Sequence, residues 1–265
     1  MHVRTGSIRG RRLAALVAVV ALVVGLGACR PVARDKPVLL IHGWSATGGT
    51  NCSSTFDPFI ADLQAQGFTG PFVKVGFYTG DTGCDMTLRD WGSFSNGSSW
   101  KELAKAFSHY VYATYTSQGQ TVDVVGYSMG GNIVRGAVYG SSTGQGGFSE
   151  PITVEDAVTL GAPHNGAAWY SSFCLWGQCA TLKPGAADIV WLNEEGNPQG
   201  EGATDWTVIG SNADAVTPAA SAVHMTLLDQ QVVIYDDVPH TGSDNYLGDD
   251  EVVLRTGESL ARPGH

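Results

Sequence analysis

A short apolar run at residues 122–125 leads directly into Gly126-Tyr127-Ser128-Met129-Gly130, and a stretch with helical spacing follows. The G-x-S-x-G pattern is weak on its own, because the chain has 35 glycines and matches it again at residues 140–144. Context separates the two matches, since a sharp turn from a buried strand into a helix exposes its serine at the strand's end. Only the first match has this context. Ser128 is therefore predicted to stand on such a turn, whereas Ser142 falls in a polar loop.

Strand-like and helix-like segments alternate along the rest of the chain. Continuous apolar runs are typical of strands buried on both faces, and apolar residues at every third or fourth position indicate helices. The predicted strands are residues 38–41, 72–78, 122–125, 154–160, 206–209 and 231–235, and the predicted helices are residues 54–66, 100–115, 129–139 and 251–260. This order predicts an α/β fold with a mostly parallel sheet and helices on both faces. Residues 37–265 form one predicted domain, in which residues 163–204 are an irregular excursion too short for a large lid domain.

The N-terminal segment is typical of an export signal. Residues 1–12 contain four arginines and no acidic residue, and residues 13–28 are an unbroken run of Leu, Ala, Val and Gly. That run is shorter than the ~20 residues that a helix needs to span a bilayer. We predict that residues 1–28 direct export and are removed. The alternative is a membrane anchor that stays attached.

The end of this run, Leu26-Gly27-Ala28-Cys29, is similar to the lipobox of bacterial lipoproteins. The resemblance implies cleavage before Cys29 and lipid attached to it, with residues 29–36 as a tether to the membrane. The protein would then be extracellular or a cell-envelope lipoprotein. Alternatively, Cys29 is removed with the signal or stays unmodified.

The cysteine count agrees with this interpretation. Five cysteines leave one unpaired in an oxidising compartment, and Cys29 is the natural odd one. The other four can form two disulfide bonds in three possible ways. We predict Cys52–Cys84 and Cys174–Cys179, because each pair lies within one local region of the chain.

Composition and charge restrict the possible partners. Hydrophobic residues make up 43% of the chain and charged residues 15%, which is typical of a globular protein. The formal net charge is −10, and loss of the N-terminal arginines would make it more negative. An acidic surface repels phosphate backbones, so nucleic-acid partners are not expected. Electrostatic docking on anionic lipid is disfavoured for the same reason. We expect a monomer.

A serine hydroxyl is a weak nucleophile and needs a base, and the base needs an orienting acid. In a strand–turn–helix layout, the acid and then the histidine follow the serine along the chain. His240 comes after the last predicted strand, at the edge where parallel sheets bind ligands, whereas His224 precedes that strand. Asp214 likewise follows the preceding strand, and Asp205 comes before it. The predicted triad is therefore Ser128, Asp214 and His240.

Two backbone N–H groups are needed to stabilise a tetrahedral oxyanion. One comes from the residue after the nucleophile, which is Met129. The other comes from a loop after an early strand, and Ile41-His42-Gly43-Trp44 follows the first predicted strand. Gly43 allows the turn to bend so that the N–H of Trp44 faces the site. The alternative for this stretch alone is an ordinary glycine turn at a strand end, with a hydrogen-bonded histidine.

Taken together, these residues resemble the small secreted bacterial lipases and esterases of the α/β-hydrolase fold (triacylglycerol lipase-like). The matching stretches occur in family order from residue 37 onward, and they are Val38-Leu39-Leu40-Ile41-His42-Gly43-Trp44, Val125-Gly126-Tyr127-Ser128-Met129-Gly130-Gly131, Leu160-Gly161-Ala162-Pro163-His164-Asn165-Gly166, Ser211-Asn212-Ala213-Asp214 and Pro239-His240-Thr241-Gly242. The resemblance implies hydrolysis of triacylglycerols or short esters, without a cofactor. It also implies backbone oxyanion donors at Trp44 and Met129.

The chain departs from this family in its lipobox, in the bulky Trp44 and in its short excursion. We expect an acyl cleft lined by Tyr127, Trp169 and Trp176, although aromatic residues in the excursion could equally only pack the loop. Larger family members bind structural calcium. No metal site is expected here, because Asp249-Asp250-Glu251 is typical of a helix start.

Three alternative functions share parts of this pattern. Cleavage of a polyester chain end would use the same residues in a more open cleft. Acyl transfer to an alcohol other than water would use the same nucleophile and oxyanion donors. A catalytically silent surface binding protein would be expected to lack a member of the triad, and none is missing.

Overall fold

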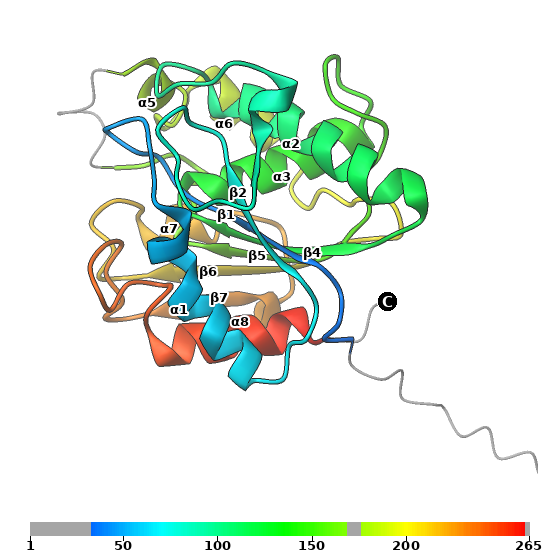
Figure 1. The fold of residues 1–265 in the computed structure, drawn as a ribbon. Helices are drawn as coiled ribbons and strands as arrows, with labels where there is room; N and C mark the ends of the chain where they lie inside the picture. The colour runs from blue at the N-terminus through cyan, green and yellow to red at the C-terminus, as the bar shows by residue number, and fades with distance from the viewer. Residues whose placement is uncertain (1–32, 169–175, 263–265) are drawn as a thin grey trace, which may run out of the picture. The chain divides into compact units, whose positions relative to one another are not determined.

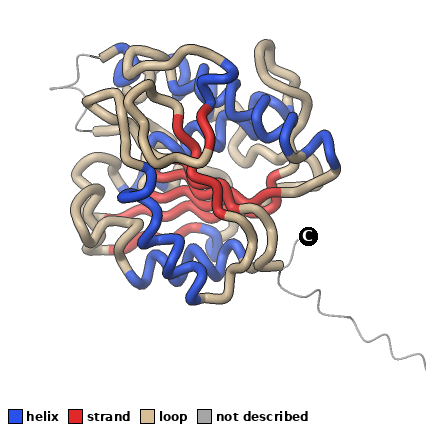
Figure 2. The backbone as a smooth tube through the Cα atoms, viewed as in Figure 1, coloured by secondary structure: helices blue, strands red, loops and turns tan. Residues whose placement is uncertain are grey.

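The computed structural model describes residues 33–168 and 176–262, which belong to one compact unit, Pro31–His265. Its centre is a sheet of seven parallel strands in the order β3-β2-β1-β4-β5-β6-β7, drawn in red in Figure 2. The strands are β1 Val38–Ile41, β2 Phe72–Gly76, β3 Met86–Thr87, β4 Val122–Tyr127, β5 Val154–Leu160, β6 Asp205–Ser211 and β7 Val232–Tyr235. This is the predicted fold class.

Helices cover both faces of the sheet (Figure 1). In the described residues, the α-helices are α1 Cys52–Ala65, α2 Trp100–Thr114, α3 Met129–Ser142, α5 Gly177–Ala180, α6 Ala187–Leu192, α7 Ala219–Ala222 and α8 Asp250–Leu260, and the 3₁₀ helices are Leu88–Trp91, Thr116–Gln118 and Asp229–Gln231. The helices α2, α3 and α6 lie on one side of the sheet, and α1 and α8 lie on the other.

Each face of the sheet has its own apolar core. Along β1, Leu39 and Ile41 pack in the core that contains α2 and α3, and Val38 and Leu40 pack in the core that contains α1 and α8. Alternate residues of a strand point to opposite faces, so a run that is apolar throughout fits only between two covered faces. The apolar run that predicted this strand therefore also explains why it lies inside the sheet and not at an edge.

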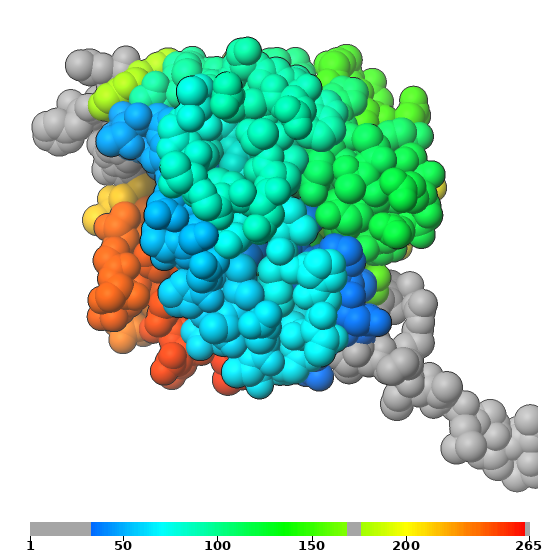
Figure 3. Space-filling model, in the orientation of Figure 1, coloured from blue at the N-terminus to red at the C-terminus, as the bar shows by residue number. Residues whose placement is uncertain are grey.

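The two ends of the described chain meet on one face. Figure 3 shows C-terminal residues in orange and red beside N-terminal residues in blue and cyan. There the Gln66 side chain, just after α1, donates a hydrogen bond to the backbone carbonyl of Val253 in α8 at 3.2 Å. Asp249 caps α8 by accepting from the N–H groups of Glu251 and Val252, so the predicted helix start is confirmed.

The predicted strands and helices are present, with ends that differ by a few residues. The sequence pattern missed β3, which has only two residues and therefore no readable alternation. In its described part, the excursion at residues 163–204 contains the short helices α5 and α6, and no large lid domain is evident there. No helix of the described ranges has the length and apolar character needed to cross a membrane.

The Cys52–Cys84 disulfide is confirmed, and it ties the first residue of α1 to the segment after β2. Cys179 is also disulfide-bonded. Its predicted partner, Cys174, lies outside the described residues, so that pairing stays a prediction. The predicted export signal and Cys29 also lie outside the described residues.

A buried charged cluster lies at the amino ends of the strands. Lys36 Nζ, just before β1, is 2.8 Å from Asp123 Oδ1 in β4 and 3.0 Å from Asp156 Oδ2 in β5. Glu155 is 3.4 Å from the same ammonium group. Asp123 and Asp156 are both about 1% exposed. One ammonium group therefore serves two buried carboxylates, and one negative charge is left without full compensation.

The excess carboxylate should make stability depend on pH. Burial, reinforced by the charge of Asp123, raises the pKa of Asp156 from 3.8 to about 8. The unfolded chain would lose this proton near pH 4 and the folded chain only near pH 8, so stability falls as pH rises through that window. Asp156→Asn cannot ionise. We expect its Tm at pH 8 to exceed that of the wild type by at least ~2–4 °C, which is roughly 1 kcal/mol for a protein of this size.

Thermal unfolding of both proteins from pH 5 to pH 8 would test this. Asp57→Asn is the matched control, because it removes a carboxylate that pairs with Lys74 at an exposed position. It should change Tm little at either pH. A Tm gain for Asp156→Asn that is equal at pH 5 and pH 8 would contradict the explanation.

Candidate active site

Ser128 stands between β4 and α3 in a strained backbone conformation. Its φ of 56° and ψ of −130° are unusual for a residue other than glycine. The turn is possible because its neighbours are small. A Cβ on Gly126 would lie 2.6 Å from Cα of Gly131, on the far side of the turn. The strand–turn–helix context predicted from the sequence is present.

The structure brings the three predicted triad residues into one hydrogen-bonded chain. His240 Nε2 lies 2.9 Å from Ser128 Oγ, and His240 Nδ1 lies 2.7 Å from Asp214 Oδ2. A carboxylate only accepts, so Nδ1 carries the proton and Nε2 is the nitrogen free to accept from the serine hydroxyl. His240 and Asp214 are only 6% and 7% exposed. This arrangement can remove a proton from the hydroxyl of Ser128.

Both carboxylate oxygens of Asp214 accept hydrogen bonds. Its Oδ1 accepts from the backbone N–H groups of Val216 and Thr217, each at 2.8 Å. Its Oδ2 accepts from His240 and from the hydroxyl of Tyr246, which is 2.9 Å away and buried. Burial and the adjacent charge of Asp214 raise the pKa of Tyr246, so this hydroxyl stays a donor. The carboxylate is thereby fixed in the orientation that holds the imidazole.

Two tyrosines around this chain have roles that the sequence did not predict. Tyr127 was expected to line the cleft, but it is not among the residues that line the pocket at Ser128. Its hydroxyl instead donates to the backbone carbonyl of His240, and its ring stacks on the imidazole with centroids 5.6 Å apart. Tyr246 was missed altogether. No spacing rule points to it, because the Tyr246–Asp214 contact depends on how two loops meet.

The predicted oxyanion loop lies directly against the serine. A Cβ on Gly43 would lie 2.7 Å from Ser128 Cβ and 3.1 Å from Ser128 Oγ, so only glycine fits there. The peptide that joins Gly43 to Trp44 is therefore next to the nucleophile. Met129 is the first residue of α3, and the first N–H groups of a helix have no partner within it. Both predicted donors are thus adjacent to Ser128.

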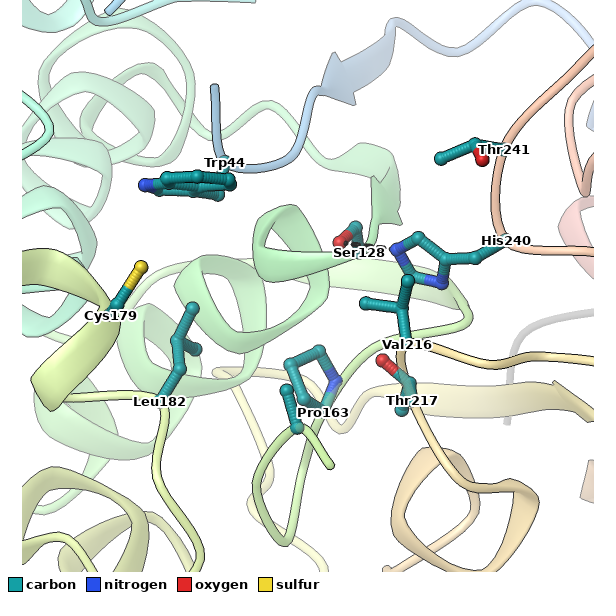
Figure 4. A pocket seen from close by; sticks show the side chains of 10 residues that line it. Trp44, Ser128, Pro163, Cys179, Leu182, Val216, Thr217, His240 and Thr241 are labelled. Atoms are coloured by element: carbon teal, nitrogen blue, oxygen red, sulfur yellow. Dashed lines mark hydrogen bonds between the residues drawn. The ribbon is translucent and has the colours of Figure 1, made fainter. Parts of the chain in front are cut away.

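A cavity of about 340 Å³ opens at Ser128 and His240. Figure 4 shows these two side chains pointing toward each other, with Trp44 and Leu182 across the pocket and Val216 beside the imidazole. Its lining is mostly apolar, and the residues are Trp44, Ser128, Pro163, Ala167, Cys179, Leu182, Val216, Thr217, His240 and Thr241. An apolar cavity that ends at a polar reactive pair can hold an apolar group and present a polar one for reaction.

Of the aromatic residues predicted for the cleft, Trp176 stands at its margin. It is 38% exposed, and its ring meets the edge of Trp44 at a centroid distance of 5.4 Å. Trp169 lies outside the described residues. The apolar lining therefore comes mainly from aliphatic side chains that have no motif in the sequence.

Two other polar residues singled out in the sequence have structural surroundings. Ser142 was expected in a polar loop, but it is the last residue of α3, and its Oγ donates to the carbonyl of Tyr139 at 3.1 Å. His164 is fully buried with Nε2 3.0 Å from Thr159 Oγ1, and burial lowers the pKa of its ring well below 6.5. Within the described ranges, no group of three or more His, Cys, Asp or Glu residues is arranged to hold a metal ion.

Comparison with known proteins identifies relatives of this chain. A family model described as palmitoyl protein thioesterase matches residues 37–197. No curated protein sequence matches the chain.

Several solved structures share the fold at low sequence identity. Phospholipase PlaB from Legionella pneumophila superposes with a TM-score of 0.61 at 14% identity, over 87% of this chain and 59% of that one. The mature lipase BlEst2 from Bacillus licheniformis gives 0.54 at 14% identity, over 86% and 89% of the two chains. The esterase Pf2001 from Pyrococcus furiosus gives 0.51 at 18% identity, over 85% and 82%. The chain thus spans little more than half of the Legionella protein, and these likenesses establish the fold.

The geometry predicts that Ser128 reacts with a phosphorus electrophile. A fluorophosphonate probe should label the wild type at Ser128, because His240 can take up the proton released. Ser128→Ala should not be labelled, and His240→Ala should react at least ~10³-fold more slowly. Peptide mapping of the labelled protein would locate the probe. Ser142→Ala is the matched control and should label like the wild type, so probe on Ser142 would refute the assignment.

Proposed function

The chain belongs to the palmitoyl protein thioesterase family, and on this premise we propose that it is a serine hydrolase that cleaves acyl esters through Ser128. One observation carries the proposal: the hydrogen-bonded chain Ser128–His240–Asp214 ends at an apolar cavity of about 340 Å³. The lipase, phospholipase and esterase of similar fold support an ester substrate.

The reaction follows from the geometry. His240 Nε2 takes the proton of Ser128 Oγ as the oxygen attacks the carbonyl carbon of the ester. The carbonyl oxygen becomes an oxyanion and accepts from the N–H groups of Trp44 and Met129. His240 then gives its proton to the leaving alcohol oxygen as the carbon–oxygen bond breaks, which leaves an acyl-enzyme on Ser128. Water then attacks the acyl carbon while His240 takes up its proton. His240 returns a proton to Ser128 Oγ as the bond between the acyl carbon and this oxygen breaks, which releases the carboxylic acid and restores the serine.

The pocket indicates which part of the ester is recognised. Leu182, Val216 and Ala167 offer hydrocarbon surface, which suits the acyl chain better than a polar alcohol. The cavity is at the small end of the ~300–1,000 Å³ found for small-molecule sites. A single linear chain fits such a volume better than a branched or polymeric substrate, so we favour fatty acyl esters over polyesters.

A thioester is the second candidate, and the matching family model favours it. The same steps apply, except that His240 protonates a leaving thiolate sulfur instead of an alkoxide oxygen. Because thiolates leave more easily, this reaction depends less on proton donation by the histidine. Acyl transfer to another alcohol would also use the same steps, with that alcohol in place of water.

The proposal is tested with p-nitrophenyl esters of increasing chain length and matched acyl thioesters. We expect wild-type kcat/KM to rise with chain length until the pocket is filled. Ser128→Ala should lower kcat by several orders of magnitude for every substrate, leaving on the order of 10³-fold over water from binding and the oxyanion donors. Val216→Trp would fill the cavity and should shift the preferred chain toward shorter acyl groups. Near-normal turnover by folded Ser128→Ala would refute the proposal.

We also propose that the protein is exported and held at a membrane by lipid on Cys29. The basic N-terminus, the apolar run and Leu26-Gly27-Ala28-Cys29 support this. Each buried methylene contributes ~0.8 kcal/mol, so two or more chains would anchor the protein firmly. Intact-mass analysis of protein from its native host should find acyl chains on an N-terminal Cys29. An unmodified protein that begins after residue 29 would contradict the anchor and leave the hydrolase proposal unaffected.

A further inference from the structure

His42 follows β1 and immediately precedes the glycine that packs on Ser128. Its ring is 1% exposed and stacks on Phe77 with centroids 4.0 Å apart. Nδ1 lies 2.8 Å from the carbonyl oxygen of Gly43, and Nε2 lies 3.1 Å from Asp81 Oδ2. Both ring nitrogens therefore have a partner in this buried position.

Both partners of the ring are acceptors. A backbone carbonyl can only accept, so Nδ1 must carry a proton. Asp81 Oδ2 already accepts from the N–H groups of Phe77 and Tyr78 at 2.6 and 2.7 Å, and Asp81 Oδ1 accepts from Thr50 N–H at 2.8 Å. Although burial opposes it, hydrogen bonding from His42 and the His42 charge, together with the Phe77 and Tyr78 amides, lower the pKa of Asp81. Three backbone N–H groups converge on this carboxyl group, so Asp81 is a carboxylate, and a carboxylate accepts from Nε2 only if Nε2 carries a proton.

A peptide unit is planar and trans, so its C=O and N–H point in opposite directions. The hydrogen bond from His42 Nδ1 directs the carbonyl of Gly43 toward the imidazole. The N–H of Trp44, which belongs to the same peptide, must then point the other way. Because Gly43 packs against Ser128, the direction of this peptide decides whether the N–H can serve the oxyanion.

We propose that His42 is an imidazolium, held by Asp81, that orients and polarises the Gly43–Trp44 peptide as an oxyanion donor. This rests on the proposed function. A charged donor on the Gly43 carbonyl draws electrons through the peptide and strengthens the Trp44 N–H, since linked hydrogen bonds reinforce one another. His42 and Asp81 touch no substrate and are positioning residues. They should affect the transition state and leave binding of the ester nearly unchanged.

The charge state can be measured without turnover. In protein labelled with ¹⁵N-histidine, one ring should carry protons on both nitrogens under the conditions of the activity assay. This signal should disappear in His42→Asn. If no ring that is lost in His42→Asn carries two protons under those conditions, the imidazolium is refuted. This readout is independent of the proposed function, which fails separately if the wild type hydrolyses no ester or thioester.

The kinetic effect separates orientation from charge. His42→Asn places an amide N–H near the position of Nδ1 and so keeps a donor for Gly43, without the charge. His42→Gln reaches toward Asp81 and leaves the Gly43 carbonyl unbonded. Removing an oxyanion donor outright costs ~10²–10³ in kcat, so weakening one should cost less. We expect kcat to fall ~10–100-fold in His42→Gln and less in His42→Asn, with KM within about twofold of the wild type.

Asp81→Asn should lower kcat in the same way, with circular dichroism and Tm used to confirm folding, because Asp81 also binds three backbone N–H groups. Asp85→Asn is the matched control. Asp85 is a carboxylate of the same segment that accepts from the N–H of Lys74 at 2.8 Å and is exposed. It should leave kcat unchanged. A rise in KM that accounts for the loss, or equal losses in His42→Asn and His42→Gln, would overturn the orienting role.

Discussion

The site depends on hydrogen bonds that continue the parallel ladder past the ends of the strands. The N–H of Ser128 donates to the carbonyl of Leu160 at 2.8 Å, and the N–H of Gly161 donates to that of Ile209 at 2.9 Å. The N–H of Asn212 then donates to the carbonyl of Tyr235 at 2.8 Å. The loops that carry Ser128 and Asp214 are thus each tied at their first residue to the neighbouring strand, and so is the loop after β5. Strand register, set by the apolar pattern, thereby fixes where the serine and the acid begin their loops.

Buried carboxylates at the two ends of the sheet differ in how fully they are hydrogen-bonded. At the carboxyl ends, Asp214 and Asp81 each accept four hydrogen bonds, so their charge is well compensated. At the amino ends, Asp123 Oδ2 and Asp156 Oδ1 are buried without a hydrogen-bond partner, and one lysine serves both residues. Well-satisfied polar groups hold a geometry, whereas unsatisfied ones cost stability. The preorganised end of the sheet is the end that carries the predicted triad.

The fold and the order of the site residues could be predicted because both follow from local pattern. Ser128 has a strand before it and a helix after it, and His240 and Asp214 follow strands whose apolar runs are readable. The roles of Tyr127 and Tyr246 could not be predicted, because a hydroxyl's partner depends on how loops from different strands fold over each other. The Asp81–His42 contact has the same origin, since it joins the ends of two neighbouring parallel strands.

Two sets of hydrogen-bonded residues support the site on either side of Ser128, and no described hydrogen bond joins one set to the other. On one side, Tyr246 and the N–H groups after Asp214 fix the acid, and Tyr127 binds the backbone of His240. On the other side, Asp81 and His42 fix the Gly43–Trp44 peptide. The first support holds the residues proposed for proton transfer, and the second holds the peptide proposed as an oxyanion donor. In both, a buried carboxylate faces a histidine ring, but only His240 has its second nitrogen directed at a hydroxyl that can give up a proton. His42 has its second nitrogen on a carbonyl, and this difference in partner separates the proposed base from the proposed positioning residue.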